Sequence, residues 1–90
     1  MLKLKLSNRF KKNYSLMEKR GYNMLLIDEV VETLLNEKPL PPSKRDHALH
    51  GDWAGFRECH VSSDWLLIYK TDGVHLLLYL ERTGTHSDLF

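Results

Sequence analysis

Residues 65–81 read WLLIYKTDGVHLLLYLE, and this stretch decides the fold that we expect. Two apolar runs flank Asp72-Gly73, a dipeptide that favours a two-residue turn between antiparallel strands. We therefore predict strands at Trp65–Thr71 and Val74–Glu81, paired so that Trp65 lies opposite Leu80. Because apolar residues fall on both faces of this hairpin, its strands should lie near the centre of a sheet.

The other elements are predicted on the N-terminal side of the hairpin. A strand at Gly55–Val61 follows a polar loop at residues 43–54. Two helices precede the loop, because apolar residues recur there with helical spacing after the suitable N-caps Ser7 and Asn23. Leu2, Leu4 and Leu6 alternate with lysines, which is typical of an edge strand. The sequence thus predicts an α+β fold of order β-α-α-β-β-β, with an antiparallel sheet, both helices on one face and the other face partly open.

Length and composition limit the kinds of protein that the sequence can encode. Ninety residues should form one domain over residues 1–90. No apolar run reaches the length of about 18 residues that a membrane-spanning helix needs, and the N-terminus lacks the apolar block of a signal peptide. The lone Cys59 forms no internal disulfide and gives no cysteine-cluster zinc site, and it should be a small buried residue. We therefore expect a cytoplasmic protein without membrane contact and without a cofactor.

Charge is distributed unevenly along the chain. Residues 1–20 hold seven basic groups and one acidic group, whereas residues 21–90 hold six and eleven. A basic segment such as residues 1–20 suits a polyanionic partner. The alternative is that the same charges form an ordinary solvated helix face.

Five histidines in a chain of this length suggest proton-transfer chemistry. His60 and Asp64 flank the predicted Ser62-Ser63 turn, and Arg82 and His86 follow the last strand. We expect these four side chains to converge at one end of the sheet, whereas His47 lies in the loop before the strands. His75 should lie on the surface of the opposite hairpin tip.

These residue types suit metal-independent cleavage of RNA. Two imidazoles can act as base and acid around a phosphodiester, a guanidinium such as Arg82 can hold the phosphate, and a carboxylate such as Asp64 can orient an imidazole. One alternative is a zinc site, although no fixed spacing supports it. Its ligands would be His47, His60, Asp64 and His86. Another alternative is that these are polar loop residues without a catalytic role.

Several blocks of the sequence together resemble the YafQ-type toxins of the RelE superfamily of toxin–antitoxin systems. The resemblance covers nearly the whole chain. It rests on the pattern H-x-L-x-G-x-W-x-G-[FY]-R at residues 47–57, on D-W-x-L-I-Y at residues 64–69 and on R-T-G-T-H-x-x-L-F at residues 82–90. Each block alone is a weak signal, and the combination is specific.

The resemblance implies a ribosome-dependent endoribonuclease, an mRNA interferase that cleaves messenger RNA in the A site of the 70S ribosome and leaves a 2′,3′-cyclic phosphate and a 5′-hydroxyl. It also implies a cognate antitoxin that blocks the toxin, and contact with operator DNA only through the antitoxin complex. The site residues that it implies are His47, His60, Asp64 and His86 for catalysis, Arg82 for phosphate binding, and Phe90 and Trp65 for substrate positioning.

A ribosomal target would give the basic N-terminal segment a partner. We predict that the cations of the helix within this segment contact ribosomal RNA, because such contacts release counterions. An inactive toxin-fold protein, acting only through antitoxin and operator DNA, is the alternative function, and ribosome-independent cleavage of RNA is a third. The predicted ribosomal RNA contacts are Arg9, Lys11, Lys12, Lys19 and Arg20.

Overall fold

The computed structural model describes residues 1–90 and contains all the predicted elements in the predicted order. Within residues 43–54, where the sequence predicted only a loop, it has a short strand between two 3-10 turns, and a short helix follows the last strand. The elements are β1 (Lys3–Leu6), α1 (Asn8–Lys19), α2 (Met24–Leu35), η1 (Pro42–Lys44), β2 (His47–Ala48), η2 (Gly51–Trp53), β3 (Arg57–Ser62), β4 (Trp65–Asp72), β5 (Leu77–Thr85) and α3 (His86–Leu89).

The two long helices begin at the residues that the sequence predicted. The side chain of Ser7 accepts a hydrogen bond from the backbone N–H of Phe10, and that of Asn23 accepts one from Leu25. Gly21 separates the helices with a positive φ of 86°, which glycine adopts without strain. No helix of the structure is long and apolar enough to cross a membrane.

The five strands form one mixed sheet of order β1-β5-β4-β3-β2. β1 occupies an edge, as its lysines predicted, but it pairs parallel to β5 and so corrects the expected all-antiparallel sheet. The other pairs are antiparallel. A parallel partner for β5 is possible because the rest of the chain, starting with α1 and α2, separates the two strands and provides the long crossover that parallel pairing needs.

The register of the central hairpin differs from the prediction. Asp72 pairs with Leu77, so the turn is longer than two residues, and a bulge between Ile68 and Tyr69 shifts the pairing further. Trp65 therefore lies opposite Thr85, not Leu80. The longer turn is stabilised by the Asp72 carboxylate, which accepts hydrogen bonds from the backbone N–H groups of Val74 and His75. The exposed side chain of His75 is at this tip, as predicted.

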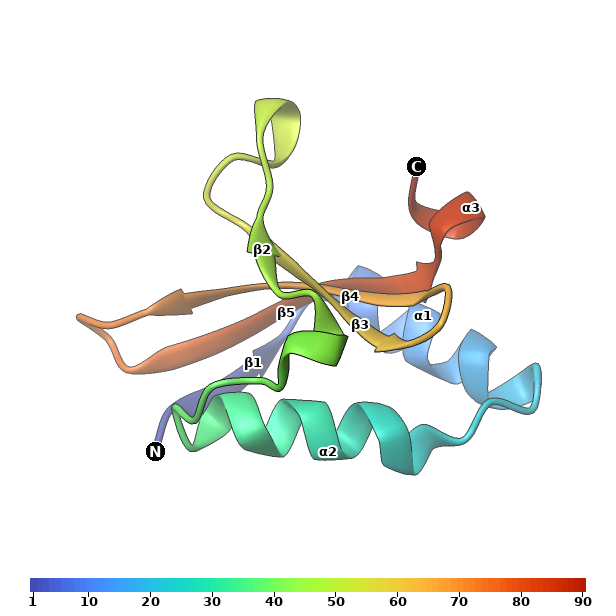
Figure 1. Ribbon diagram of the computed structural model, residues 1–90, viewed down its shortest axis with the longest axis horizontal. Helices are drawn as coiled ribbons and strands as arrows, with labels where there is room; N and C mark the ends of the chain where they lie inside the picture. Colours follow the sequence, from blue (N-terminus) through green and yellow to red (C-terminus); the bar gives the residue numbers. More distant parts are fainter.

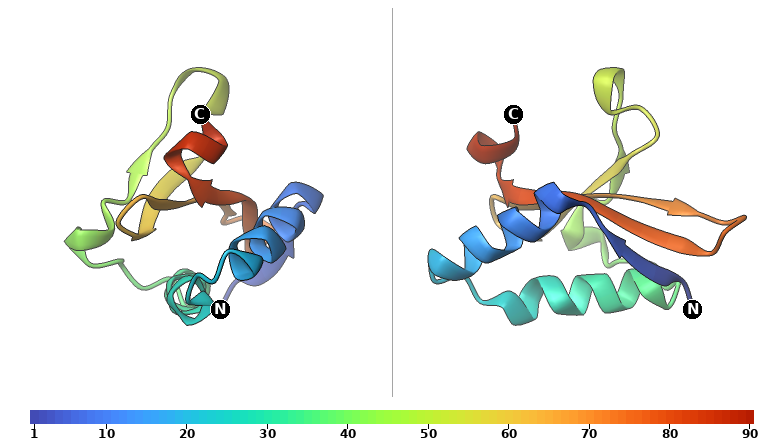
Figure 2. Two further views of the ribbon diagram at one scale, coloured as in Figure 1. Left: turned by 90° about the vertical axis from the view of Figure 1, so that its right-hand side faces the viewer. Right: turned by 180° about the vertical axis from the view of Figure 1, so that it is seen from behind.

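The sheet has a covered face and a face that we call the open face. In Figures 1 and 2, α1 and α2 lie on one side of the sheet, whereas residues 47–56, which we call the arm, and α3 rise on the other side. The larger core packs between the sheet and the two long helices and includes Phe10, Met17, Ile27 and Trp65. Leu66, Ile68 and Leu89 form a smaller cluster on the open face, where aromatic residues of the arm pack against it.

Candidate functional site

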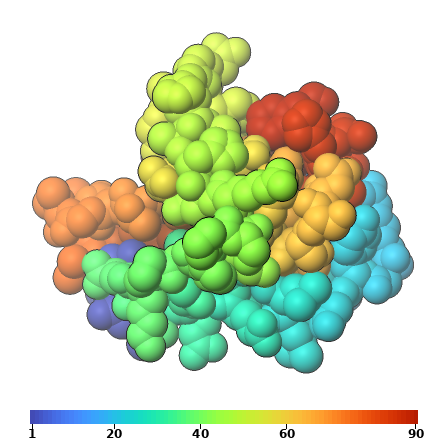
Figure 3. Space-filling view, in the orientation of Figure 1, coloured from blue at the N-terminus to red at the C-terminus, as the bar shows by residue number.

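The open face carries most of the polar residues that the sequence singled out. Side chains alternate between faces along a strand, and Glu58, His60 and Arg82 share a face with Leu66 and Ile68 through the pairs Glu58–Ile68, His60–Leu66 and Ile68–Arg82. His47 joins them, because it pairs with Glu58 across β2 and β3. The arm and the C-terminal residues stand side by side above this face (Figure 3). The open face is therefore our candidate active site.

The backbone holds His47 and His60 in the same way. Nδ1 of His47 lies 2.7 Å from the carbonyl oxygen of Arg45, and Nδ1 of His60 lies 2.8 Å from that of Ser63. A carbonyl only accepts, so each Nδ1 must donate and carry a proton. The lone pair of a neutral ring is then on Nε2, the atom that can take up a further proton.

Glu58 is a member of the site that the sequence analysis missed. Glu58 is only 7% exposed, and its Oε1 lies 3.6 Å from Nε2 of His47. The contact is an ion pair only when that imidazole carries both protons. The signal in the sequence was a charged residue beside Cys59 in a strand that is otherwise largely buried, but the partner on β2 could not be foreseen because no strand was predicted there.

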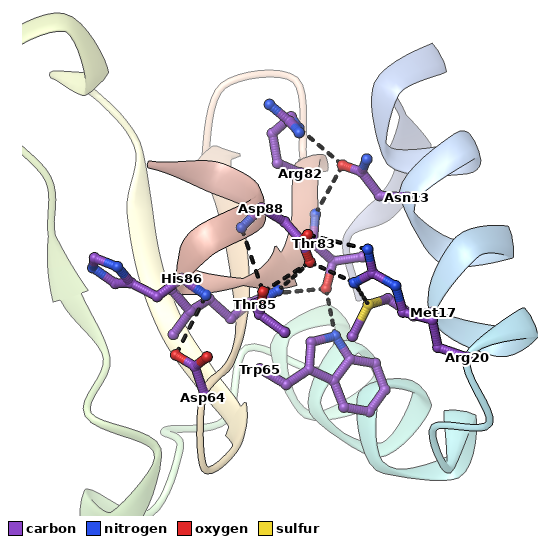
Figure 4. A network of polar contacts seen from close by, with 11 residues as sticks. Asn13, Met17, Arg20, Asp64, Trp65, Arg82, Thr83, Thr85, His86 and Asp88 are labelled. Atoms are coloured by element: carbon purple, nitrogen blue, oxygen red, sulfur yellow. Dashed lines mark hydrogen bonds and ion pairs between the residues drawn. The ribbon is translucent and has the colours of Figure 1, made fainter.

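His86 is positioned by the helix that it begins. The side chain of Thr85 caps α3 by accepting from the backbone N–H of Asp88, and the Asp88 carboxylate accepts from the backbone N–H of Thr85 in return. Oδ1 of Asp64 accepts a hydrogen bond of 3.3 Å from the backbone N–H of His86. Asp64 therefore orients the start of α3, whereas the sequence analysis expected it to orient an imidazole. In Figure 4 the ring of His86 points away from Asp64 and Asp88.

Arg20 holds α3 from the end of α1. Its Nη1 and Nη2 lie 2.7 and 3.2 Å from the two carboxylate oxygens of Asp88 (Figure 4). The Arg20 guanidinium, together with the Thr85 donors, lowers the pKa of the Asp88 carboxyl far below its ordinary value. The charge of Arg20 is thus paired within the chain while its side chain stays 38% exposed, and its contact with ribosomal RNA remains a prediction.

Arg82 lies further from the β3–β4 turn than the sequence predicted. It pairs with Ile68 in the middle of β4, since the longer hairpin turn and the bulge move Thr85 to the end of the sheet. Its Nε donates a 2.9 Å hydrogen bond to Oδ1 of Asn13, which also accepts from the backbone N–H of Thr83. Asn13 is a second residue that the sequence analysis missed, because nothing in the sequence indicates that α1 faces this part of β5.

The two aromatic residues predicted to position a substrate differ in exposure. Phe90 is 54% exposed, and its ring centroid lies 5.2 Å from that of His86 and 6.4 Å from that of Trp53 in the arm. Trp65 is 1% exposed and packs in the core, where its Nε1 donates to Oγ1 of Thr83 over 2.9 Å. Trp65 therefore has no surface for stacking on a base.

The covered face carries a second polar network at the base of the arm. The Tyr69 hydroxyl donates to Oδ1 of Asp46, and the Arg57 guanidinium lies 3.3 Å from both oxygens of the same carboxylate. Burial, followed by the hydrogen bond to Asp46, raises the pKa of the Tyr69 hydroxyl. Cys59 is a buried core residue, as predicted, and burial raises the pKa of its thiol to about 12.

The other four residues predicted to contact ribosomal RNA are exposed on α1. Three of them border one shallow hollow of about 390 Å³ together with Ser15 and Leu16. This group is separate from the open face. Its members are Lys11, Lys12 and Lys19, and Arg9 is exposed on the same helix.

The donor groups of the site do not form a metal centre. No three side chains of His, Cys, Asp or Glu come close enough to hold an ion together. Among the histidines of the open face, the shortest approach to a carboxylate is the 3.6 Å contact of His47 with Glu58, which offers two donors where zinc usually takes three or four from the protein. His47, His60, Asp64 and His86 are thus not arranged as the alternative zinc site required.

Comparison with known proteins identifies the class of this fold and site. The family model that describes a bacterial toxin of type II toxin–antitoxin system, YafQ, matches residues 2–90. The mRNA interferase toxin YafQ of Escherichia coli strain K12 is 44% identical over 86 residues, which cover 93% of this chain and 90% of the relative. The chain thus has the RelE-like fold of a small bacterial toxin. It belongs to the YafQ family of type II toxin–antitoxin systems.

Two solved structures show how closely the fold agrees. The metal-bound toxin from Helicobacter pylori is 40% identical, with a TM-score of 0.93 and full coverage of both chains. YafQ in the E. coli DinJ-YafQ toxin-antitoxin complex is 39% identical, with a TM-score of 0.89, over 100% of this chain and 99% of that one. The resemblance inferred from the sequence motifs is confirmed.

Proposed function

We propose that this toxin is a ribosome-dependent endoribonuclease that cleaves messenger RNA in the A site. The observation that carries the proposal is the arrangement of His47 and His60, whose Nδ1 atoms are bound to backbone carbonyls so that Nε2 is left for proton transfer on the open face. Arg82 lies on the same face, and His86 starts the helix at its end. The relative in E. coli is named an mRNA interferase, which supports the same chemistry here.

In the proposed reaction, Nε2 of His60 takes the proton of the substrate's 2′-hydroxyl. We assign the base to His60 rather than His47 because Nε2 of His47 faces the carboxylate of Glu58. The 2′-oxygen then attacks the phosphorus, and the bond to the 5′-oxygen breaks as His86 donates a proton to that oxygen. The products are a 2′,3′-cyclic phosphate and a 5′-hydroxyl. Arg82 holds the phosphate, which suits a guanidinium already oriented by Asn13.

The supporting residues act on the position of these groups. Asp64 and the Arg20–Asp88 ion pair hold α3, so that His86 and Phe90 stay above the open face. Phe90, with its exposed ring beside that of His86, stacks on or packs against a base of the message.

Replacement of His86 tests the proposal. A His86→Ala variant should lose about 10²–10⁴-fold in the cleavage of translated messenger RNA, the usual size of a general acid–base contribution. Thermal stability should be retained because His86 is exposed, and antitoxin binding should be retained because His86 does not line the apolar groove between β1, α1 and α2 that we propose for the antitoxin. Full growth arrest on expression of the variant would contradict the assignment.

We propose that the reaction needs no metal ion from the toxin. The donor geometry supports this, although a relative from H. pylori has been crystallised with metal bound. A zinc-selective chelator that spares the magnesium of the ribosome should leave cleavage unchanged. Loss of activity with the chelator, reversed by zinc alone, would favour a metal-dependent reaction.

We propose two macromolecular contacts away from the open face. A cognate antitoxin neutralises the toxin, as the DinJ-YafQ complex suggests. An apolar groove of about 670 Å³ between β1, α1 and α2 offers the antitoxin a binding surface. The toxin then contacts operator DNA only through its complex with the antitoxin. The exposed cations of α1 contact ribosomal RNA beside the A site, whereas Arg20 is already paired with Asp88. These cations are Arg9, Lys11, Lys12 and Lys19. Both contacts fit a cytoplasmic protein.

A further inference from the structure

A hollow of about 530 Å³ lies between η1 and the turn that joins β3 to β4. Apart from His60, its polar lining consists of two cations and three serine hydroxyls, which can donate hydrogen bonds to an anion, and no carboxylate borders it. Because His60 is one of the lining residues, the hollow adjoins the proposed catalytic base. The polar lining residues are Ser43, Lys44, Arg45, His60, Ser62 and Ser63.

Most of these donors have no partner within the chain. The Arg45 guanidinium forms no ion pair, although four ion pairs occur elsewhere in the structure. Nζ of Lys44 makes one hydrogen bond, 2.8 Å long, to the carbonyl oxygen of Val61 and so keeps two of its three donors free. The three serine hydroxyls make no hydrogen bond to the chain. Two cations and three hydroxyls around one hollow match the several acceptor oxygens of a phosphate group.

The backbone at both walls of the hollow is held in an uncommon conformation. Arg45 has φ 48° and ψ 41°, and Ser63 has φ 40°, so two residues other than glycine occupy the left-handed region. Such conformations cost free energy and tend to cluster at functional sites. The carbonyls of these same two residues orient His47 and His60. The hollow and the catalytic imidazoles are therefore built from one set of backbone positions.

We propose that this hollow binds a phosphate of an RNA backbone, next to the phosphodiester that is cleaved. This inference rests on the proposed function, because it extends the RNA-binding surface from His60 towards η1. The phosphate belongs either to the message or to ribosomal RNA, since both present the same group. An acidic segment of a protein is less suitable, because a single carboxylate has only two oxygens and cannot accept from both cations and all three serine hydroxyls.

A binding measurement in a non-cleaving background tests this site. The parent is His86→Ala, and the test variant adds Lys44→Gln and Arg45→Asn, since asparagine tolerates the left-handed conformation of position 45. The matched control adds Lys3→Gln, a change of charge on β1 at the opposite edge of the sheet. Affinity is measured for 70S ribosomes with and without a message, over a range of salt concentrations. Circular dichroism establishes that the variants are folded.

The test variant should bind message-carrying ribosomes about tenfold more weakly than the parent, or about 1.4 kcal/mol. Its salt dependence should be flatter by about one for each lost phosphate contact, and Lys3→Gln should change neither quantity. A loss confined to message-carrying ribosomes identifies a phosphate of the message, whereas an equal loss on empty ribosomes identifies ribosomal RNA.

Unchanged affinity for ribosomes and unchanged salt dependence would overturn the phosphate site. Failure of the proposed function is a separate result: the parent would bind no ribosome, or would still cleave the message.

Discussion

The buried hydrogen bond between Trp65 and Thr83 allows a direct test of whether Trp65 acts through packing. Oγ1 of Thr83 accepts from the indole N–H over 2.9 Å and donates to the carbonyl of Leu66 over 2.7 Å, and both residues are 1% exposed. A Thr83→Val change keeps the shape of the side chain but leaves the indole N–H without a partner. We expect the variant to fold with reduced stability.

The magnitude follows from the contacts that are lost. Each hydrogen bond contributes about 1 kcal/mol net, and an unpaired buried N–H costs about a further 1–3 kcal/mol. Because two hydrogen bonds are lost, the free energy of unfolding should fall by about 3–5 kcal/mol, a large part of the total of about 5–15 kcal/mol that is usual for a domain. In a Trp65→Phe background the same change leaves no unpaired indole, so the double variant should be more stable than the sum of the single changes by about 1–3 kcal/mol.

Urea unfolding followed by far-ultraviolet circular dichroism measures these differences, and cleavage is expressed per folded molecule. If Trp65 acts only through the core, Trp65→Phe should lower stability while cleavage per folded molecule changes by less than about tenfold. A variant that keeps its stability within about 0.5 kcal/mol and yet loses cleavage would refute the reasoning and favour contact with the substrate.

Two further predictions concern the charged groups around α1 and α3. Lys11→Ala/Lys12→Ala should weaken ribosome binding and flatten its salt dependence by about one per lost phosphate contact; unchanged ribosome affinity with weaker antitoxin binding would contradict it. The lowered pKa of Asp88 means that its carboxylate stabilises the folded state above the ordinary pKa of about 3.9 and that this stability is lost as the pH falls towards the lowered value. Asp88→Asn should therefore be less stable than the unaltered protein at pH 7, and urea unfolding should show the difference narrowing from about pH 5 to about pH 2; a constant difference would exclude the ion pair with Arg20 as its cause.

The sequence predicted the fold where the signals are local. The caps Ser7 and Asn23 and the apolar alternation of the strands each act within a few residues, and they are found where expected. The hairpin register was missed because the Asp72 side chain stabilises a longer turn than Asp-Gly usually forms. The bulge beside Ile68 leaves no mark in the sequence at all.

The candidate site was predicted in its residue types more than in its contacts. The histidines and Arg82 follow from the motifs, but the partners that orient them come from distant parts of the chain or from the backbone. Asn13 meets Arg82 across 69 positions, and Arg20 meets Asp88 across 68. Backbone carbonyls, which carry no sequence signal, hold His47 and His60. Contacts of this kind appear only once the chain is folded.

Ribosome-dependent cleavage by proton transfer is the central claim, and one comparison tests it most directly. The unaltered toxin and its His86→Ala variant are given a message under translation and naked RNA of the same sequence, and the ends of every fragment are analysed. We predict cleavage of the translated message alone, by the unaltered toxin alone, with 2′,3′-cyclic phosphate and 5′-hydroxyl ends. Equal cleavage of naked RNA, or fragments with 5′-phosphate and 3′-hydroxyl ends, would contradict the account.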